Sequence, residues 1–579
     1  VALHVALAFP DLYEIATSHF GIQILYSILN NENDILAERV FAPATDMEAL
    51  LREKKVSLFS LESKTPLKKF DIIGFSLLYE LNYTNMLNML DLSGIPFFTH
   101  ARGNIDPFII AGGPCMCNPE PIADFFDAIV VGDGEAVILQ MADDWKQWRK
   151  KSTRDRHSLL KSWSQIKGVY IPSFFEYPPS GRGPRRLISK QADRQYVERA
   201  VVPDLNDVSS PQLPIIPFGK PIHDRLRMEI ARGCTRGCRF CQAGMIYRPV
   251  RERHPQRIVS SIERLLTATG YEDISLLSLS TGDYSCIARL MEQIMAFGET
   301  DHVAISLPSL RAGSLTPELM ELIRRVRKTG FTIAPEAGSQ RLRDVINKNI
   351  TEEDIMSGSG SAFRAGWTRV KLYFMLGLPT ETMEDVQAIP DLVGRIRERY
   401  RDIAAKKDRK RLSIAVGTSS FVPKPFTPFQ WVGQDRLESL REKQQLLKQK
   451  LRIPGVEYRW HDVQTSLLEA VFARGDRRLG AVMLRALQKG CRLDGWAEHF
   501  RYDLWMEAFR EAGLEPVFYA NRVRAEGEIL PWEHIDIGVS KSYLWREYQR
   551  ALRGEDPPDC RTQCAGCGVQ KSWGGGLCP

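Results

Sequence analysis

Short apolar runs of strand length alternate with helical stretches along the first part of the chain. The strand-like runs, each ending in a turn, are Val5–Phe9, Asp71–Leu77, Phe108–Gly113 and Ala128–Glu135. Apolar residues at helical spacing lie between them, as in Phe20–Leu29 and Met47–Glu53. This alternation predicts an α/β domain over residues 1–165, with a parallel, doubly wound, Rossmann-like sheet that binds ligands at the carboxyl ends of its strands.

The alternation of strand-like and helical segments stops after residue 165 and begins again near residue 216. Residues 166–215 are rich in proline and polar side chains, which predicts a linker between domains. Over residues 216–455 strand and helix alternate again, and repeated βα units predict a complete or partial TIM barrel with its chemistry at the carboxyl rim of the strands. The expected strands are Arg227–Ile230, Asp273–Leu279, Val303–Leu307, Gly330–Pro335 and Val370–Leu376, and the expected helices include Gln256–Thr267 and Pro317–Lys328.

The last segment, residues 456–579, is predicted to be mainly helical. Helical patterns cover Val463–Ala473, Ala481–Leu487 and Ala497–Glu511, and a tail rich in glycine and cysteine follows.

Composition narrows the class of protein. The 579 residues are 44% hydrophobic and 26% charged, as in core-forming proteins, and the net charge of +7 is mild for this length. No apolar run approaches the roughly 20 residues that span a bilayer, and the first residues lack the basic flank of a signal peptide. We therefore expect a cytoplasmic protein with no membrane partner. Basic stretches at 395–401 and 406–412 are typical of solvated outer helices, and contact with nucleic acid is the alternative.

Eleven cysteines carry the most specific chemical signal. Cys234, Cys238 and Cys241 form a C-x3-C-x2-C motif, with Phe240 before the third cysteine, on a loop directly after a predicted strand. Three thiolates at this spacing can ligate three irons of a cubane and leave the fourth iron open. A structural zinc site, which normally has four protein ligands, and inert buried cysteines are the alternatives.

This motif resembles the signature of the radical S-adenosylmethionine (SAM) superfamily. The resemblance implies a [4Fe–4S] cluster on Cys234, Cys238 and Cys241, whose open iron binds the amino and carboxylate groups of SAM. Reduction of SAM there yields methionine and a 5′-deoxyadenosyl radical. It also implies an electron donor such as flavodoxin or ferredoxin.

The same resemblance assigns SAM-binding roles to residues at later strand ends. Gly282 lies in the segment expected to hold the methionine amino group, and Ser306 is a candidate for the methionine carboxylate. Glu336 is the candidate for the ribose hydroxyls, and Arg343 could pair with the carboxylate. Gly377 lies in the expected adenine-side loop. For each of them a helix cap or a strand-end turn is the structural alternative.

The first segment resembles the cobalamin-binding domain of B12-dependent radical SAM enzymes. Ser76, in an S-x-L element, and Gly112 with Gly113 follow successive predicted strands, and residues 132–135 (GDGE) match the closing turn of such domains. The D-x-H-x-x-G motif that supplies an axial histidine elsewhere is missing, and His19 is the nearest histidine. Cobalamin is therefore expected to bind without a histidine ligand; a domain that has lost the cofactor is the alternative. Over its whole length the chain resembles an uncharacterised family of B12-binding-domain radical SAM proteins.

The tail repeats the cysteine spacing. Cys560, Cys564 and Cys567 form a second C-x3-C-x2-C, and Cys578 is near enough in sequence to be a fourth ligand. The interpretations are a structural zinc site, an auxiliary iron–sulfur cluster, or free thiols.

These interpretations lead to three alternative hypotheses about function. The first is a cobalamin-dependent radical SAM methyltransferase of unknown substrate. The second is a cobalamin-free radical SAM enzyme that uses an auxiliary C-terminal cluster to modify RNA or protein, for example by methylthiolation. The third is a non-catalytic, metal-binding RNA module. No catalytic residue beyond the cofactor ligands is predicted.

Overall fold

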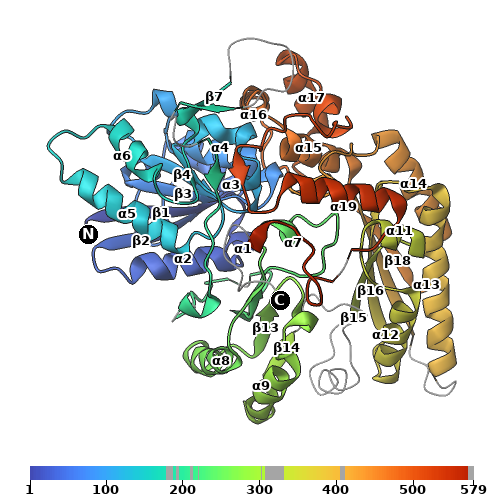
Figure 1. The fold of residues 1–579 in the computed structure, drawn as a ribbon. Helices are drawn as coiled ribbons and strands as arrows, with labels where there is room; N and C mark the ends of the chain where they lie inside the picture. Colours follow the sequence, from blue (N-terminus) through green and yellow to red (C-terminus); the bar gives the residue numbers. More distant parts are fainter. Residues whose placement is uncertain are drawn as a thin grey trace.

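A computed structural model describes residues 1–177, 187–190, 195–208, 211, 213–219, 221–301, 303–306, 331–404, 411–557 and 559–570. Within these residues an N-terminal α/β domain and a partial barrel lie side by side, and a group of C-terminal helices packs against both (Figure 1).

The N-terminal domain is a six-stranded sheet in the order β2-β1-β3-β4-β5-β6, parallel except for β6, which runs antiparallel to β5. Its strands are β1 (Leu3–Phe9), β2 (Ile35–Phe41), β3 (Ile72–Ser76), β4 (Phe108–Gly112), β5 (Ala128–Val130) and β6 (Val169–Tyr170). The connecting helices are α1 (Tyr13–Ala16), α2 (Phe20–Asn30), α3 (Thr45–Lys54), α4 (Tyr83–Leu92), α5 (Glu135–Arg149) and α6 (Arg156–Trp163).

The strand β1 shows why this sheet forms and where it binds ligands. Every residue of β1 except His4 is buried, as expected of a central parallel strand covered on both faces. From β1 the chain passes to β2 on one side and then to β3 on the other. A crevice therefore opens between the carboxyl ends of β1 and β3, and open α/β sheets bind ligands at such a switch point.

Strand β2 could not be predicted from its pattern, since Glu38 and Arg39 interrupt its apolar run. Glu38 is nevertheless buried, because Ser60 and Ser63 donate hydrogen bonds to its carboxylate at 2.6 and 2.7 Å.

The barrel consists of two parallel sheets, in the orders β10-β13-β14 and β15-β16-β17-β18. The strands are β10 (Leu226–Glu229), β13 (Asp273–Leu277), β14 (Ala304–Ser306), β15 (Phe331–Glu336), β16 (Arg369–Leu376), β17 (Ser413–Ser420) and β18 (Val456–Trp460). The helices are α7 (Ala243–Ile246), α8 (Pro255–Thr269), α9 (Ile287–Asp301), α11 (Gln340–Val345), α12 (Glu352–Arg364), α13 (Met383–Ile403) and α14 (Leu437–Lys450). The predicted α/β fold with a partial barrel is confirmed, and the expected helix Pro317–Lys328 lies outside the described residues.

The barrel extends beyond its predicted end at residue 455. Strand β18 pairs in parallel with β17, with Val456 opposite Ile414. The prediction missed it because none of its five residues is buried, so its apolar pattern is weak.

The C-terminal region is not an independent helical unit. Its elements are α15 (Val463–Arg474), α16 (Leu479–Gln488), α17 (Tyr502–Glu511), α18 (Pro516–Ala520), β19 (Ile535–Asp536) and α19 (Lys541–Arg553). These elements share one hydrophobic core with the N-terminal sheet. Asn118, for example, donates hydrogen bonds to the carbonyls of Ala473 and Gly475, both at 3.0 Å. The last segment thus completes the N-terminal domain, a long-range packing that local patterns do not encode.

The predicted linker also belongs partly to the folded domains. It contributes β6 to the N-terminal sheet, and its strand β9 (Val197–Glu198) pairs with β19. It also forms the short pair β7 (Phe175–Glu176) and β8 (Ile188–Ser189). Strands of two residues leave no periodic signal in a sequence.

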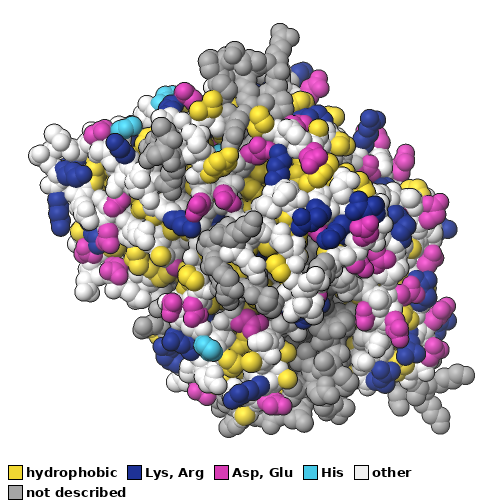
Figure 2. Space-filling view, in the orientation of Figure 1, with side chains coloured by type: hydrophobic (Ala, Val, Ile, Leu, Met, Phe, Trp, Pro, Cys, Tyr) yellow, Lys and Arg dark blue, Asp and Glu magenta, His cyan; other side chains and the backbone are white. Residues whose placement is uncertain are grey.

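Acidic and basic side chains are interspersed over the face seen in Figure 2, including the surface of α19. The basic run at 395–401 lies on α13, whereas residues 406–410 of the second run lie outside the described residues. In the described part of the chain, no helix is long and apolar enough to cross a membrane.

Candidate active site

The first cysteine trio lies on a loop, residues 233–242, that we call the cluster loop. It follows β10 and is flanked by a hairpin of β11 (Ala231–Arg232) and β12 (Arg251–Glu252). Gly233 has a φ of +91°, and a Cβ there would lie 2.6 Å from the carbonyl oxygens of Tyr247 and Pro249. Only glycine allows this close approach, so the residue before Cys234 is fixed by backbone geometry.

Barrel residues hold the backbone of the cluster loop. The side-chain amide of Asn347 donates to the carbonyl of Gly237 at 3.0 Å. Arg239, whose side chain is fully buried, donates from its backbone amide to Ile346 O at 3.0 Å and from its guanidinium to Val345 O at 2.9 Å. The cysteines are therefore presented from a preorganised backbone.

The thiols lie close enough to influence one another. Burial, together with the neighbouring Cys238 and Cys234, raises the pKa of Cys241 to about 12, although the amide of Gly244, 3.4 Å from Sγ, favours the thiolate. Three such thiols ionise together only when a metal compensates their charge. This donor set fits a cluster held by Cys234, Cys238 and Cys241.

Two of the predicted SAM-binding segments lie against the cluster loop. Gly282 is part of the 3-10 turn η8 (Thr281–Asp283), and Asp283 forms an ion pair with Arg236 of the loop. Glu336 ends β15 at a bulge, and its carboxylate lies 3.0 Å from Lys348 Nζ, which sits 5.7 Å from the centre of the Phe240 ring.

The φ of Glu336 is +67°, a costly conformation for a residue other than glycine, which marks it as a functional candidate. The sequence analysis missed Lys348, which bears no motif. Contact of Gly282 and Glu336 with SAM stays a prediction.

The structure corrects the role predicted for Arg343. Its guanidinium is fully buried and donates to the carbonyls of Ala337, Gly338 and Ile350, at 2.9 to 3.2 Å. These bonds occupy the side chain inside the protein, so Arg343 supports the loop after Glu336 instead of pairing with a SAM carboxylate.

The structure places Gly377 and Ser306, the other two predicted SAM-binding residues, at a turn and at a strand end. Gly377 has a φ of +80°, and its amide donates to the carboxylate of Glu381 at 2.8 Å, so the structure gives it a place in a tight turn. Ser306 is the last residue of β14, opposite Ser275 of β13, but its side chain lies outside the described residues.

A cavity of about 510 Å³ lies between the N-terminal sheet and the barrel. It sits at the carboxyl ends of β1, β3 and β4, the switch point of the sheet, and extends to Arg232 and Gly233 beside the cluster loop. Its apolar lining includes Leu7, Phe20, Ile24, Leu25, Phe75, Ile110, Val130, Ile138 and Leu279. The volume falls within the range of roughly 300–1,000 Å³ typical of cofactor and ligand sites.

The three residues predicted from cobalamin-domain elements all line this cavity. Ser76 ends β3, Gly112 ends β4, and Gly113 follows directly after β4. Gly113 has φ +113° and ψ 173°, and a Cβ on it would lie 2.4 Å from the carbonyl oxygen of Leu77. Gly112 has no atom within 3.9 Å of its would-be Cβ, so a side chain there has room.

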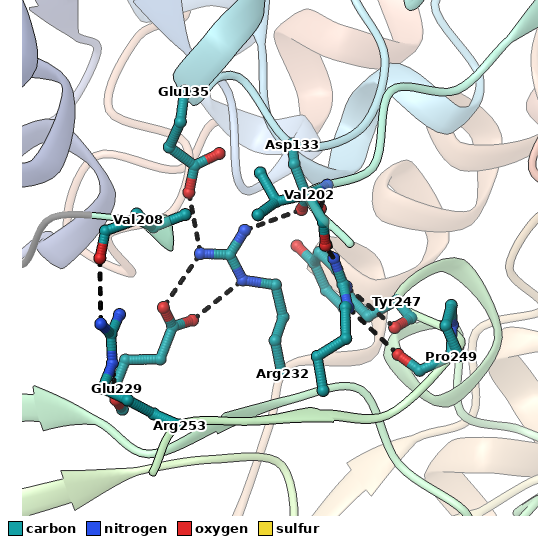
Figure 3. Close-up of polar contacts among 10 residues, drawn as sticks. Asp133, Glu135, Val202, Val208, Glu229, Arg232, Tyr247, Pro249 and Arg253 are labelled. Atoms are coloured by element: carbon teal, nitrogen blue, oxygen red, sulfur yellow. Dashed lines mark hydrogen bonds and ion pairs between the residues drawn. The ribbon is translucent and has the colours of Figure 1, made fainter. Parts of the chain in front are cut away.

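An ion-pair network joins the two domains at the edge of the cavity (Figure 3). Arg232 lies 2.8 Å from Asp133 Oδ1 and 2.9 Å from carboxylate oxygens of both Glu135 and Glu229. Arg251 lies 2.5 Å from the other oxygen of Asp133.

Burial alone would raise the pKa of Asp133, but Arg232 and Arg251 outweigh it and hold that pKa below its usual value. The sequence analysis noted the GDGE turn that supplies Asp133 and Glu135, but missed the arginines that bind it. Their only local signal is the position of Arg232 next to Gly233 and Cys234.

The second cysteine trio also lies near the cluster loop. Asp559, beside Cys560, is 3.7 Å from Arg236, and Arg561 is 3.4 Å from Asp283. Cys567 is buried, Cys560 is partly buried and Cys564 is exposed. Cys578 lies outside the described residues.

Two family models match the chain. The model described as radical SAM proteins, N-terminal, matches residues 21–172, and that of the radical SAM superfamily matches residues 228–393. The chain contains a radical SAM domain. It is thus a radical SAM enzyme, and such a domain uses a [4Fe–4S] cluster and SAM, which the cluster loop and its surroundings fit.

Relatives extend this likeness. An uncharacterised protein of Methanocaldococcus jannaschii is 29% identical over 510 residues, which cover 86% of this chain and 96% of that protein. The anaerobic magnesium-protoporphyrin IX monomethyl ester cyclase of Cereibacter sphaeroides is 24% identical, and this chain spans 40% of its length.

A solved structure shares the fold. The radical SAM methyltransferase TsrM from Kitasatospora setae, with cobalamin and a [4Fe–4S] cluster bound, superposes with a TM-score of 0.50 at 14% identity, over 74% of this chain and 77% of that one. At this identity the likeness is one of fold alone.

Proposed function

We propose that the protein is a cobalamin-dependent radical SAM methyltransferase, with cobalamin held in the cavity between the N-terminal sheet and the cluster loop. The observation that carries this proposal is the position of the cavity. One wall is the switch point of a Rossmann-like sheet, and the other reaches Gly233, directly before Cys234. A cofactor there lies beside the place where SAM binds. The substrate is left unassigned.

The lining suits a large, mostly apolar cofactor. Three glycines, Gly74 within β3 and Gly112 and Gly113 at the end of β4, leave this part of the cavity wall free of side chains, so a flat ring can approach the backbone. Polar groups gather at one side, where Arg232, Asp133, Glu135 and Glu229 also line the cavity. When bound, the cluster and SAM supply reductive cleavage, and cobalamin supplies a carrier for the methyl group.

His19 lines the cavity but is not suited to bind cobalt. It is partly buried, and desolvation lowers its pKa to about 4, so its ring is neutral. Its Nδ1 accepts a hydrogen bond from the amide of Ile22 at 3.2 Å, at the start of α2. The proton therefore sits on Nε2, and this nitrogen is a donor with no lone pair for a metal. His19 caps the helix, in keeping with cobalamin bound without a histidine ligand.

The test is anaerobic purification with hydroxocobalamin, followed by measurement of cobalt, iron and SAM cleavage. We expect about one cobalt and at least about four irons per chain, with 5′-deoxyadenosine formed on addition of SAM and a reductant. The matched variant is Gly112→Leu, which places a side chain in the cavity where the backbone tolerates one. It should lose cobalt and keep its iron and its SAM cleavage. Cleavage with no cobalt in the wild type would overturn the proposal and favour a cobalamin-free enzyme.

A further inference from the structure

The C-terminal cysteines lie on a segment that is fastened to the cluster loop and its neighbours. Besides the contacts of Asp559 and Arg561 described above, Arg239 of the loop donates to the carbonyl of Glu555 at 2.5 Å. Arg561 also lies near enough to Cys234 for their charges to interact. The two cysteine trios are thus neighbours in space although more than three hundred residues separate Cys234 from Cys560.

The thiols of this segment sit in a backbone arrangement like that of the cluster loop. The amide of Ala565 donates to the sulfur of Cys560, and the amide of Gly566 donates to Cys564 Sγ at 3.4 Å. Cys241 accepts the amide of Gly244 at the same distance in the cluster loop. In both segments a backbone amide thus points at a cysteine sulfur.

A buried cation faces these thiols. Arg248 is buried and lies near Cys560 and Cys567. In the described part of the chain no carboxylate forms an ion pair with it, and its Nη2 atom has no hydrogen-bond partner. That atom lies 3.6 Å from the position a Cβ would take on Gly237 of the cluster loop.

A buried guanidinium needs negative charge nearby to offset its desolvation. The described contacts place the Tyr543 hydroxyl and the two thiols around Arg248 as groups that can carry negative charge. Metal-bound thiolates would supply that charge, and Arg248 would in turn lower the cost of gathering thiolates at this place.

We infer that Cys560, Cys564 and Cys567 hold a second metal centre, an iron–sulfur cluster, with Arg248 between it and the cluster loop. The spacing repeats the motif that serves the radical SAM cluster in this same chain. Three thiolates at this spacing suit a cubane with one open iron. This inference does not depend on cobalamin.

The experiment compares iron, sulfide, zinc and cobalt in three proteins, each purified and reconstituted anaerobically. They are the wild type, the triple variant C234A/C238A/C241A, and the triple variant C560A/C564A/C567A. We expect about eight irons in the wild type and about four in each variant. After reduction with dithionite, the cluster-loop variant should keep an iron–sulfur electron paramagnetic resonance signal that differs from that of the tail variant. Because this signal is read in a protein with an intact tail, it stands even if the tail variant folds poorly.

Two outcomes would overturn the inference. About four irons in the wild type, all lost in the cluster-loop variant, would exclude a second cluster. About one zinc per chain that disappears only in the tail variant would assign the site to zinc. Cobalt should be unchanged in the tail variant, so a failure here is separate from a failure of the proposed methyltransferase.

Arg248 gives an independent readout. In the cluster-loop triple variant, Arg248→Met should lower the iron retained by the tail and shift its resonance signal, whereas Arg248→Lys should preserve most of both. Equal iron content and identical spectra in the Arg248→Met and Arg248→Lys proteins would contradict the position assigned to Arg248.

Discussion

The guanidinium of Arg232 lies 2.8 Å from the carboxylate of Asp133 and so ties the cluster loop to the N-terminal domain. Arg232 stands two residues before Cys234, while Asp133 belongs to the turn after β5 that lines the cavity. One ion pair therefore sets the position of the first cluster ligand relative to the proposed cobalamin site.

Replacing Arg232 should strongly weaken the contact between the N-terminal domain and the cluster loop. In Arg232→Met the carboxylates of Glu135 and Glu229 lose their partner while still largely buried, so we expect the free energy of unfolding to fall by about 3–5 kcal/mol. Urea unfolding of the purified protein measures it. The control is Arg459→Met, since Arg459 is 75% exposed and its pair with Glu457 should contribute at most about 1 kcal/mol. Equal losses in the two variants would show that the network does not couple the domains.

Cys238→Ala should abolish SAM cleavage and remove about four irons per chain, because three thiolates are needed to hold the cluster. Iron analysis and chromatography of 5′-deoxyadenosine measure both effects. Cys286→Ala is the matched control, since Cys286 follows η8 and lies outside the cysteine motifs. It should keep the iron and the activity of the wild type. Cleavage that survives in Cys238→Ala would refute the assignment of the cluster loop.

The cluster loop and the parallel sheets could be predicted because their signals are local. The spacing of Cys234, Cys238 and Cys241 is read within eight residues, and the buried strand β1 is a continuous apolar run. The network around Arg232 could not be predicted in the same way. Its partners Asp133 and Glu135 lie 99 and 97 positions away, and the sequence around Arg232 contains no pattern that predicts these contacts.

For Gly112 and Gly113 the position could be predicted from the sequence, but the role of each residue could not. The pair Gly112–Gly113 was noted for its place at a strand end, but any strand end can carry glycine for structural reasons. Only the structure distinguishes the two residues, since Gly113 has a backbone conformation reserved for glycine and Gly112 does not. Arg343, in contrast, has an environment that differs from the predicted one. Its position on a helix after Glu336 does not indicate that its guanidinium bonds to buried carbonyl groups.

Gly113→Ala should disrupt the edge of the cavity. Its φ and ψ lie in a region open almost only to glycine, which costs other residues about 1–3 kcal/mol, and its Cβ would also collide with Leu77 O at 2.4 Å. We expect lower stability together with weaker cobalamin binding, measured by urea unfolding and by titration with hydroxocobalamin.

Gly94→Ala is the control for Gly113→Ala. Gly94 also has a positive φ, +62°, but a Cβ there would meet no atom within 4 Å. This variant should lose only about 1 kcal/mol and bind cobalamin as the wild type does. Weakened binding in Gly94→Ala would mean that the assay reports general destabilisation and not the shape of the cavity.

Asp494 should make stability depend on pH in the acidic range, below its pKa of about 6. Its carboxylate is buried where the C-terminal region meets α4, and it accepts hydrogen bonds from Thr84 Oγ1 at 2.7 Å and Trp505 Nε1 at 2.9 Å. Burial raises its pKa to about 6, and the two hydrogen bonds only partly oppose this. The folded protein therefore keeps a proton on Asp494 that the unfolded chain releases near pH 4.

Because the folded pKa is the higher one, the stabilising contribution is complete below the unfolded pKa and is lost as pH rises toward 6. The contribution of Asp494 to the free energy of unfolding should fall by about 1.4 kcal/mol per pH unit between about pH 4 and pH 6 and stay level above that. Asp494→Asn has the same shape and no charge, so it should lack this slope. The measurement is the difference in urea midpoint between the two proteins at half-unit steps from pH 4.5 to 7. A difference that does not change with pH would show that Asp494 is ionised in the folded protein throughout this range.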